Sequence, residues 1–303
     1  MPELDHTVLD APAHGMRLDR YVAERLALLP RSQVKARNLS ALVNGRPAKL
    51  SFPVRSGDIL RLAWDEPEPS DLIPEDIPLN VLYEDRRTVV IDKVRGMVVH
   101  PGAGNRQGTL ANALCHRRLL RGGPEPAGFR PGIVHRLDKD TSGVMIAAYD
   151  DEALAFLAGQ FKSGRVRKRY LAIACGIPRE SSGRIETFIA RDSRNRKRFA
   201  VCDRGKHSLT LYSVLKTWKR HSLLLLRPRT GRTHQIRVHL RHLGHPVFGD
   251  PIYGLPDPSF PDAGLMLHAR SLRITLPGEE EARKFKARIP DHFVALMRTL
   301  DGE

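Results

Sequence analysis

Five polar and charged side chains lie close together in one short stretch of this 303-residue chain: His135, Arg136, Asp138, Lys139 and Asp140. Apolar runs precede and follow them, a pattern that predicts a strand, a loop and a second strand. Loops held by rigid strands often carry catalytic groups. The local pattern alone also allows a solvated charged turn.

Asp138 is the residue of this loop best suited to chemistry. Its nearest charged neighbours in sequence are Arg136 and Lys139, so its carboxylate should stay ionised and an arginine should orient it. An aspartate nucleophile with a paired arginine is a coherent catalytic unit. Asp–Arg pairs are equally common as structural elements, and the sequence does not separate the two interpretations.

Two other chemistries have weaker support. Ser142 lies outside a Gly-x-Ser-x-Gly motif, which favours a cap or a turn over a nucleophile. Gly102, Gly104 and Gly108 would need a parallel βαβ unit and an acid about twenty residues further on to bind a dinucleotide, and a Gly/Pro loop stands there instead. We interpret these glycines as a tight turn.

Four nearby histidines raise the question of a metal site: His234, His239, His242 and His245. No carboxylate or cysteine is placed to complete a zinc set, and the His-Glu-x-x-His motif is absent. We therefore expect no metal at these histidines. Because arginines alternate with these histidines, RNA contacts or packing inside the domain are the preferred interpretations.

The composition favours a nucleic-acid partner. The chain carries 50 basic and 34 acidic residues, a net charge of +16, and no basic amphipathic membrane anchor is evident. No apolar run approaches the ~18 residues of a membrane span, and the N-terminus lacks a secretory signal. Cys115, Cys175 and Cys202 are widely separated, which favours a reducing compartment over disulfides. We expect a cytoplasmic monomer.

The pattern along the chain predicts two domains. Residues 1–15 predict a loose polar lead-in. Residues 16–65 predict a compact module of two helices and a small sheet, with Ser32 capping the second helix and a hairpin turn at Asn44-Gly45. Residues 66–79 are rich in proline and acids, which predicts an extended, solvated linker.

Residues 80–303 predict an α+β domain. Strand-like segments outnumber helices, and hairpins outnumber βαβ crossovers, so we expect a mixed, largely antiparallel central sheet with flanking helices. The helices are expected at residues 108–119, 152–161, 230–243 and 293–300.

The N-terminal module resembles the S4 RNA-binding domain. The resemblance rests on short motifs: Arg17-Leu18-Asp19, Arg31-Ser32-Gln33-Val34, Val43-Asn44-Gly45, and Val54 with Gly57-Asp58. It implies a basic face that contacts RNA phosphates without reading sequence. A small stabilising domain with a solvated basic face is the alternative.

From about residue 16 to residue 276 the chain resembles the RluA family of pseudouridine synthases, and within it the RluD-type enzymes of the large ribosomal subunit. The motifs stand in the family's order at residues 98–105, 135–143, 168–170, 230–239 and 244–254. One departure is Asp92-Lys93-Val94, where the family usually has Asn-Lys-Pro. It puts the geometry of that turn in doubt.

The resemblance implies isomerisation of uridine to pseudouridine in RNA, most naturally 23S ribosomal RNA, without metal, nucleotide cofactor or energy source. The steps would be aspartate attack, glycosidic cleavage, uracil rotation and formation of a C–C bond. Asp138 matches the catalytic aspartate, and Arg237 matches the arginine paired with it. Tyr170 matches the tyrosine that packs on the base and is a candidate to take the C5 proton.

The resemblance also implies residues that contact the substrate. Leu267 should line the uracil pocket, and Arg136 should fill the gap left by the flipped nucleotide. Further substrate contacts are expected from His135, Arg232, His234 and Gln235. Phosphates flanking the flipped base should meet Arg165, Arg167, Lys168, Arg169, Arg194, Arg196, Lys197 and Arg198.

Two other classes of function stay open at this point. A non-catalytic RNA-binding or ribosome-assembly factor on the same scaffold would need none of Asp138, Tyr170 and Arg237. A metal-dependent nuclease would need a clustered acidic site, which the sequence lacks. The sequence names neither the uridines modified nor their number.

Overall fold

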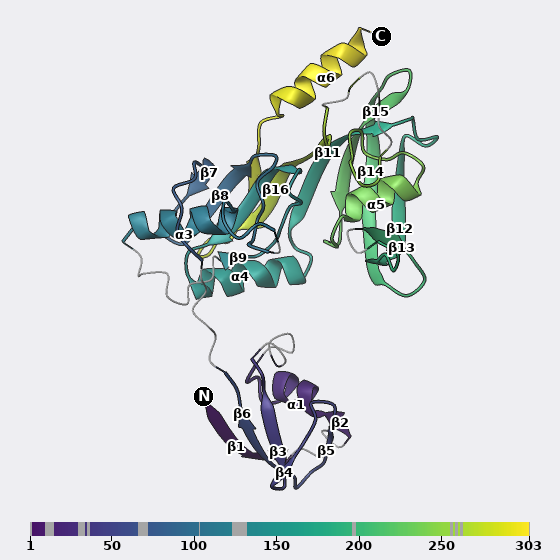
Figure 1. Ribbon diagram of the computed structural model, residues 1–303. Coiled ribbons are helices and arrows are strands. Elements are labelled where there is room, and N and C mark those ends of the chain that lie inside the picture. The colour runs from purple at the N-terminus through teal and green to yellow at the C-terminus, as the bar shows by residue number, and fades with distance from the viewer. Residues whose placement is uncertain are drawn as a thin grey trace. The chain divides into compact units, whose positions relative to one another are not determined.

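The computed structural model divides the chain into two compact units, Met1–Asp71 and Leu72–Glu303 (Figure 1). The structure describes residues 2–9, 15–29, 34, 37–65, 72–102, 104–122, 132–195, 198–254, 257, 260 and 263–302. Among these residues, no helix is both long and apolar enough to cross a membrane.

The N-terminal unit is built on a small antiparallel sheet with the strand order β1-β6-β3-β4. The strands are β1 (Glu3–Thr7), β6 (Ile59–Ala63), β3 (Ser40–Val43) and β4 (Arg46–Pro47). A separate pair joins β2 (Met16–Arg17) to β5 (Pro53–Val54), and helix α1 spans Leu18–Glu24. The buried face of α1, with Leu18 and Val22, belongs to the same apolar core as Leu60 and Leu62 of β6.

This unit differs from the sequence expectation before its first helix and at the end of that helix. Residues 1–15 are not simply a lead-in, because Glu3–Thr7 forms β1 and pairs antiparallel with β6. The first of the two expected helices is α1, which ends at Glu24, and Ala27 beyond it has a φ of 49°. The expected second helix, with Ser32, falls mostly outside the described residues. The hairpin turn at Asn44-Gly45 is confirmed, with φ values of 51° and 76°.

The second unit contains a long mixed sheet, in which the described strands follow the order β13-β12-β14-β15-β11-β16-β10-β8-β7. In chain order the strands are β7 (Asn80–Glu84), β8 (Thr88–Lys93), β9 (Gly132–Ile133), β10 (Ser142–Ala148), β11 (Arg167–Cys175), β12 (Ser182–Arg191), β13 (Phe199–Val201), β14 (Lys206–Thr217), β15 (His221–Pro228), β16 (Leu267–Thr275) and β17 (Ala282–Lys286). Strand β9 pairs with β10, and β17 pairs with β16. Only the β10–β16 pair is parallel among the pairings of these described strands, so the predicted α+β class with a largely antiparallel sheet is confirmed.

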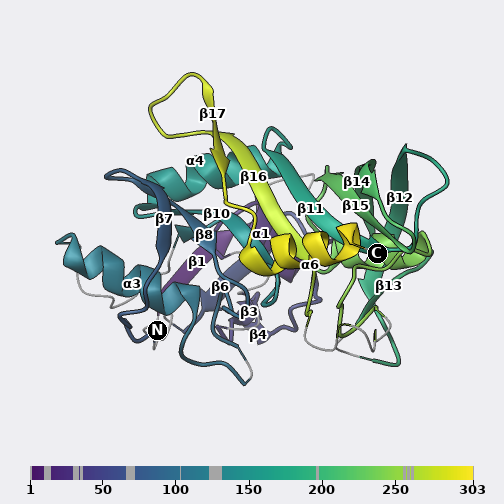
Figure 2. The same cartoon turned by 90° about the horizontal axis from the view of Figure 1, so that it is seen from above.

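Four helices of this unit lie against the sheet: α3 (Leu110–Leu120), α4 (Asp151–Lys162), α5 (Gln235–His242) and α6 (Asp291–Asp301). Thr109 caps α3 by accepting a hydrogen bond from the Asn112 backbone, and Asp150 caps α4 in the same way from Ala153. Figure 2 shows α6 lying across one face of the sheet.

The second unit begins before the expected boundary at residue 80. The Glu75 carboxylate accepts a hydrogen bond of 3.0 Å from Gly108, and the backbone carbonyl of Ile73 accepts one from Asn112. Glu75 and Ile73 are therefore tied to the start of α3, and the first part of the predicted linker, residues 66–71, lies outside the described residues.

One glycine fixes the strand that follows the polar loop. The Ser142-Gly143 pair was expected to form a turn with Thr141, but both residues begin β10. Gly143 has a φ of 117°, and a Cβ there would lie 2.3 Å from the carbonyl oxygen of Ala269. Only glycine allows β10 to approach β16 this closely. The turn lies one step earlier, where Thr141 donates to the carbonyl of Asp138 at 3.1 Å.

Candidate active site

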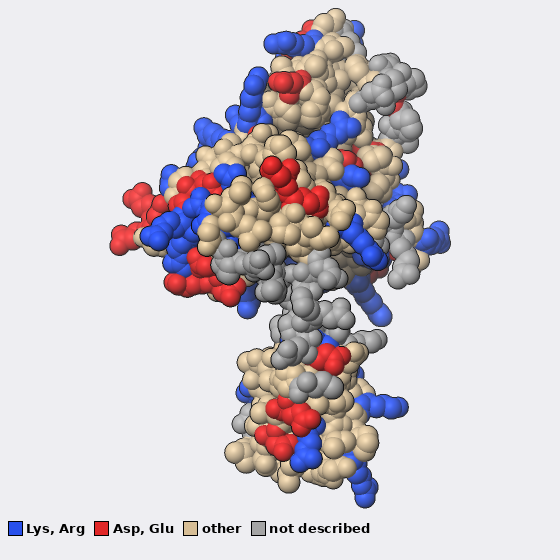
Figure 3. Space-filling view, turned by 60° about the vertical axis from the view of Figure 1, so that its left-hand side comes forward, with Lys and Arg blue, Asp and Glu red and all other residues tan. Residues whose placement is uncertain are grey.

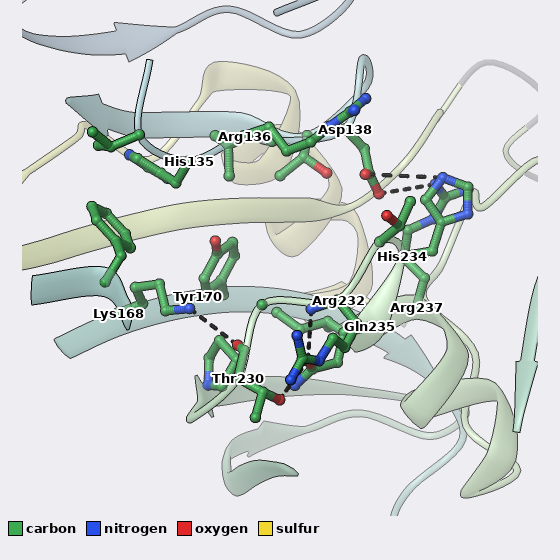
Figure 4. Close-up of a pocket in the computed structure, with 18 of the residues that line it drawn as sticks. His135, Arg136, Asp138, Lys168, Tyr170, Thr230, Arg232, His234, Gln235 and Arg237 are labelled. Atoms are coloured by element: carbon green, nitrogen blue, oxygen red, sulfur yellow. Dashed lines mark hydrogen bonds and ion pairs between the residues drawn. The ribbon is translucent and has the colours of Figure 1, made fainter. Parts of the chain in front are cut away.

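The second unit contains a pocket of about 620 Å³, which Figure 4 shows in close-up. Its wall is contributed by the loop between β9 and β10, by α4, by β11, by the segment from β15 into α5, and by the start of β16. This volume falls in the range of small-molecule sites. Nine of its lining residues were expected to act in catalysis or substrate binding: His135, Arg136, Asp138, Tyr170, Arg232, His234, Gln235, Arg237 and Leu267. Lys168, expected to contact flanking phosphates, also lines it.

Asp138 is held in this pocket by an arginine that lies 99 positions further along the chain. Arg237, on α5, donates from Nη1 to Asp138 Oδ2 at 3.1 Å. The same guanidinium donates from Nε and Nη2 to the two carboxylate oxygens of Asp250, each at 2.7 Å. Asp250 thus fixes the plane of the guanidinium and leaves its third nitrogen to orient Asp138.

The Arg237–Asp250 pair is ionised in spite of its burial. The side chain of Arg237 is 5% exposed and that of Asp250 is 0% exposed. Burial opposes both charges, but the pair holds the pKa of Asp250 below its usual range and raises the pKa of Arg237. Asp250 also accepts hydrogen bonds from the backbones of Ile252 and Tyr253, at 2.9 and 3.0 Å. A doubly hydrogen-bonded buried pair of this kind is a rigid support.

His234 stands on the other side of Asp138. Its Nε2 lies 3.9 Å from Asp138 Oδ1, and its Nδ1 shares a 2.9 Å hydrogen bond with the Tyr253 hydroxyl. The residue has a φ of 56° just before α5, a left-handed conformation that turns its ring towards Asp138 (Figure 4). Burial lowers the pKa of His234, which favours the neutral imidazole.

Tyr170 lies on β11 with its ring in the pocket. Burial raises the pKa of its hydroxyl, and the nearby Asp138 carboxylate raises it further. The phenol is therefore protonated at neutral pH. Leu267, at the start of β16, is 3% exposed and adds an apolar surface to the same pocket.

The side-chain amide of Gln235 forms all its hydrogen bonds within the protein, so it supports the pocket wall and has no free hydrogen-bonding position for a ligand. Its Oε1 accepts from Thr230 Oγ1 and from the Arg232 backbone, at 2.7 and 3.0 Å. Its Nε2 donates to the Leu209 carbonyl and to Thr210 Oγ1. All four hydrogen-bonding positions of the amide are filled. Gln235, expected to bind substrate, instead fixes the 230–232 segment that lines the pocket.

Lys168 belongs to the pocket wall. Its Nζ donates to the Thr230 carbonyl at 3.1 Å, and burial, with a smaller effect from Arg232, lowers its pKa to about 8. Adjacent residues of a strand point to opposite faces, so Arg167 and Arg169 face away from the side of Lys168 and Tyr170. Lys168 was expected among the groups that grip flanking phosphates, but the structure separates it from these two arginines.

The remaining predicted contacts are spread over several elements. His135 lines the pocket, but its Nε2 accepts a hydrogen bond of 3.1 Å from Ile146, and its ring stacks on Phe161. Arg136 and Arg232 are exposed residues of the pocket lining. Arg194 is exposed, Arg198 lies over the Tyr253 ring, and Arg165 lies at a different hollow. Arg196 and Lys197 lie outside the described residues.

Sequence reasoning gave no role to three residues that support the site. Asp250 and Tyr253 were noted only as parts of a motif, although they hold Arg237 and His234. Lys93 is 1% exposed and donates three hydrogen bonds of 2.9 to 3.0 Å to the carbonyls of Val94, Met97 and Lys139. The last of these anchors the residue next to Asp138. A lysine that ends a strand with the apolar run Val89-Val90-Ile91 was the available signal.

The histidines near α5 are packing and support groups. His239 is 0% exposed and shares hydrogen bonds with the hydroxyls of Thr187 and Thr210. His245 shares one with the Cys175 carbonyl. Within the described part of the chain, no group of three or more His, Cys, Asp or Glu residues is arranged to hold a metal ion.

The pocket holds a carboxylate fixed by an arginine, and the chain around it is strongly basic, which together favour an enzyme that acts on a polyanion such as a nucleic acid. A family model described as RNA pseudouridylate synthase matches residues 87–242, which is just over half of the chain. The chain belongs to this family and is an RNA pseudouridine synthase.

Relatives and solved structures agree with this assignment. Ribosomal large subunit pseudouridine synthase D of Borreliella burgdorferi is 43% identical over 293 residues, covering 94% of this chain and 89% of the relative. An uncharacterized RNA pseudouridine synthase of Chlorobaculum parvum is 43% identical over 308 residues, covering 94% of both chains. The structure of human RNA Pseudouridylate Synthase Domain Containing 4 matches with a TM-score of 0.59 and 27% identity, covering 73% of this chain and 93% of that one.

Proposed function

We propose that this chain converts specific uridines of large-subunit (23S) ribosomal RNA to pseudouridine, with Asp138 as the nucleophile and no metal or other cofactor. The choice of RNA is supported by similarity to relatives named ribosomal large subunit pseudouridine synthase D, which extends over 94% of this chain for the Borreliella burgdorferi protein.

One observation supports the role of Asp138 above all others. Its carboxylate lies in the pocket, 3.1 Å from an arginine nitrogen that Asp250 holds in place. The Asp138 side chain is 19% exposed, so it is accessible to a nucleotide that enters. A purely RNA-binding protein would have no use for a buried support of this kind beneath a pocket carboxylate.

The proposed reaction rearranges bonds without adding or removing atoms. Asp138 attacks the bound nucleotide, at the sugar C1′ or at the base, and the bond between N1 and C1′ breaks. The uracil turns in the pocket, C5 forms the new bond to C1′, and the bond between Asp138 and the nucleotide breaks, which releases the free carboxylate. The proton on C5 then leaves, and N1 acquires one, so the product is an isomer of the substrate.

Tyr170 is the candidate that takes the C5 proton. Because its raised pKa keeps the hydroxyl protonated, it can accept this proton only after passing its own to a neighbour, and Asp138 is the nearby carboxylate. The Tyr170 ring and Leu267 would hold the flat uracil through its rotation. Flipping the nucleotide out of its stack costs a few kcal/mol. The exposed Arg136 would occupy the space that the flipped nucleotide leaves.

The N-terminal unit would add affinity for RNA. Its motifs within residues 16–65 resemble the S4 domain, and basic residues such as Arg17, Arg20 and Arg61 are exposed on it. Arg17 and Arg20 lie next to or on helix α1, where they pair with Asp19 and Glu24 and would exchange these partners for phosphates. We place the protein in the cytoplasm as a monomer, where ribosomal RNA would be its substrate.

Mapping of pseudouridines in ribosomal RNA tests this function. Cells with and without this gene should differ at one or more large-subunit uridines, and the purified protein should form pseudouridine at the same positions in an unmodified transcript. Identical maps, together with no product from the purified protein, would contradict the proposal.

A further inference from the structure

Three neighbouring strands carry cations directly opposite one another. Arg167 of β11 pairs with Arg273 of β16, and Arg273 pairs with Lys284 of β17. In the next row of the same face, Arg169 lies opposite Ser271, which in turn lies opposite Lys286. Paired residues point to the same face of a sheet, so these side chains form two rows on one surface.

This surface faces away from the catalytic pocket. Lys168 and Tyr170 line the pocket, whereas Arg167 and Arg169 alternate with them along β11. Further along the sheet, the same face is covered by α6, where the rings of Phe293 and His268 lie 6.4 Å apart. Figure 2 shows β11, β16 and β17 beside α6 on this side of the unit.

The cations of the two rows are exposed and lack acidic partners. Arg167, Arg169, Arg273, Lys284 and Lys286 are all exposed, and none forms an ion pair with a carboxylate of the described residues. Lys286 lowers the pKa of Lys284, with smaller contributions from desolvation and from Arg169, Arg270 and Arg273. The surface therefore carries a concentrated positive charge without internal compensation. On the face of the molecule that Figure 3 shows, lysines and arginines lie among aspartates and glutamates.

Cross-strand pairs of like charge destabilise a sheet. The row of three cations contains two such pairs, Arg167–Arg273 and Arg273–Lys284, and the repulsion in each pair destabilises the sheet. A bound polyanion would remove the repulsion, which gives such a row a function that a merely solvated face lacks.

A hollow of about 210 Å³ lies at the end of the rows. Arg165, Arg167 and Arg273 line it, together with Gln160, Ile274, Thr275 and Ala282, and it shares no residue with the catalytic pocket. Gln160 is tied in place by two hydrogen bonds with the Thr275 backbone, of 2.8 and 3.0 Å. Three arginines that line one hollow supply the charge and the hydrogen-bond donors that a phosphate group needs.

We propose that Arg165, Arg167, Arg169, Arg273, Lys284 and Lys286, the cationic rows, bind the phosphate backbone of a second RNA segment, separate from the segment whose uridine enters the pocket. This inference rests on the proposed RNA function and extends it. The enzyme would hold its RNA at two places, so that a folded substrate binds better than the target loop alone. Arg165, Arg167 and Arg169 would contact this second segment and not the phosphates beside the flipped base.

The surface fits RNA better than a membrane. Among the described residues of β11, β16 and β17, no large apolar side chain is exposed. A membrane-bound surface needs apolar side chains that enter the lipid next to its cations. Flat rows of lysine and arginine suit a phosphodiester backbone, where binding comes from charge.

The test replaces three of the cations together, Arg273→Gln, Lys284→Gln and Lys286→Gln. The control variant, Arg179→Gln with Lys219→Gln and Arg220→Gln, removes the same charge from exposed positions at the opposite end of β11, where His221 pairs with Cys175. A third variant, Arg273→Lys with Lys284→Arg and Lys286→Arg, keeps the charge and reports on folding.

Binding is measured with an unmodified transcript of large-subunit ribosomal RNA over a range of salt concentrations. The first variant should bind about tenfold more weakly, and its slope of log affinity against log salt should fall by about 2, while both other variants behave as the wild type. In the pseudouridine assay, its KM should rise about tenfold with kcat unchanged.

Unchanged affinity and slope in the first variant would overturn the inference, as would an equal loss in the charge-matched control. Loss of binding to phosphatidylglycerol vesicles with RNA binding intact would overturn it in favour of a membrane. Failure of the proposed function has a different signature, because then the wild-type protein forms no pseudouridine in this transcript, whatever the variants bind.

Discussion

Asp250 holds the guanidinium of Arg237 through two hydrogen bonds of 2.7 Å, and the third nitrogen of that guanidinium is the one that contacts Asp138. The proposed nucleophile is therefore oriented by an arginine that cannot turn away from it.

Breaking the Arg237–Asp250 pair should damage both stability and catalysis. Arg237→Gln leaves a fully buried carboxylate without its partner, which should lower the free energy of unfolding by about 3–5 kcal/mol and reduce kcat. Urea unfolding and the pseudouridine assay measure the two effects. Arg241→Gln on the same helix, at an exposed position, is the control. The double variant with Asp250→Asn should lose less stability than the two single losses added together, and simple additivity would contradict the coupling.

Asp138→Asn should abolish turnover while RNA binding survives. The amide keeps the size of the side chain but removes the nucleophile, so kcat should fall by about 10⁴-fold or more. Asp140→Asn, a change of the same chemistry two residues away and outside the pocket lining, should leave kcat within a few-fold. Single-turnover pseudouridine formation and filter binding of RNA measure the two properties. Normal turnover by the Asp138 variant would remove this residue from the mechanism.

Tyr170→Phe separates the ring from the hydroxyl. If the hydroxyl takes the C5 proton, kcat should fall by about 10²–10⁴-fold while RNA affinity stays the same, because the phenylalanine ring still packs on the base. Release of tritium from uridine labelled at C5 measures the proton loss directly. A rate within threefold of the wild type would assign Tyr170 to stacking alone.

Buried histidines should make the catalytic unit unstable in acid. Burial lowers the pKa of His239 and of His268 to about 4, and both side chains are 0% exposed. Between pH 6.5 and pH 4 the unfolded chain binds protons that the folded protein does not, so stability falls as the pH falls. Each histidine should account for about 3 kcal/mol across this interval.

Urea unfolding at a series of pH values from 7 to 4 tests this expectation. His239→Gln, whose amide can still bond the hydroxyls of Thr187 and Thr210, should flatten the pH dependence relative to the wild type. The exposed His242→Gln on the same helix should not. A variant at residue 239 with an unchanged pH profile would assign the acid sensitivity to other groups.

Helix caps and tight turns depend on residues that are adjacent in sequence, so the sequence alone predicted them. Thr109 and Asp150 cap helices close to the expected positions, and Asn44-Gly45 makes the expected hairpin. The order of motifs along the chain identified the family and pointed to Asp138, Tyr170 and Arg237. The structure brings these three side chains to one pocket.

The tertiary structure decided which side chains meet and which face each one occupies. Strand β1 lies against β6, more than fifty residues away, because its unpaired backbone groups found a sheet edge that no local pattern reveals. Likewise, the run Arg165 to Arg169 looked like one basic patch. Strand alternation divides it, with Lys168 in the pocket wall and Arg167 and Arg169 on the opposite face.

The residues that support Asp138 show the same difference between what the sequence predicts and what only the fold decides. The sequence determined that Asp138 lies in a tight loop between two strands, because its apolar and polar residues are adjacent along the chain. It did not determine that Asp250 would fix Arg237 or that Lys93 would anchor the carbonyl beside Asp138. Those contacts join residues that are far apart in sequence, so only the closed fold, in which buried charges must find partners, brings them together.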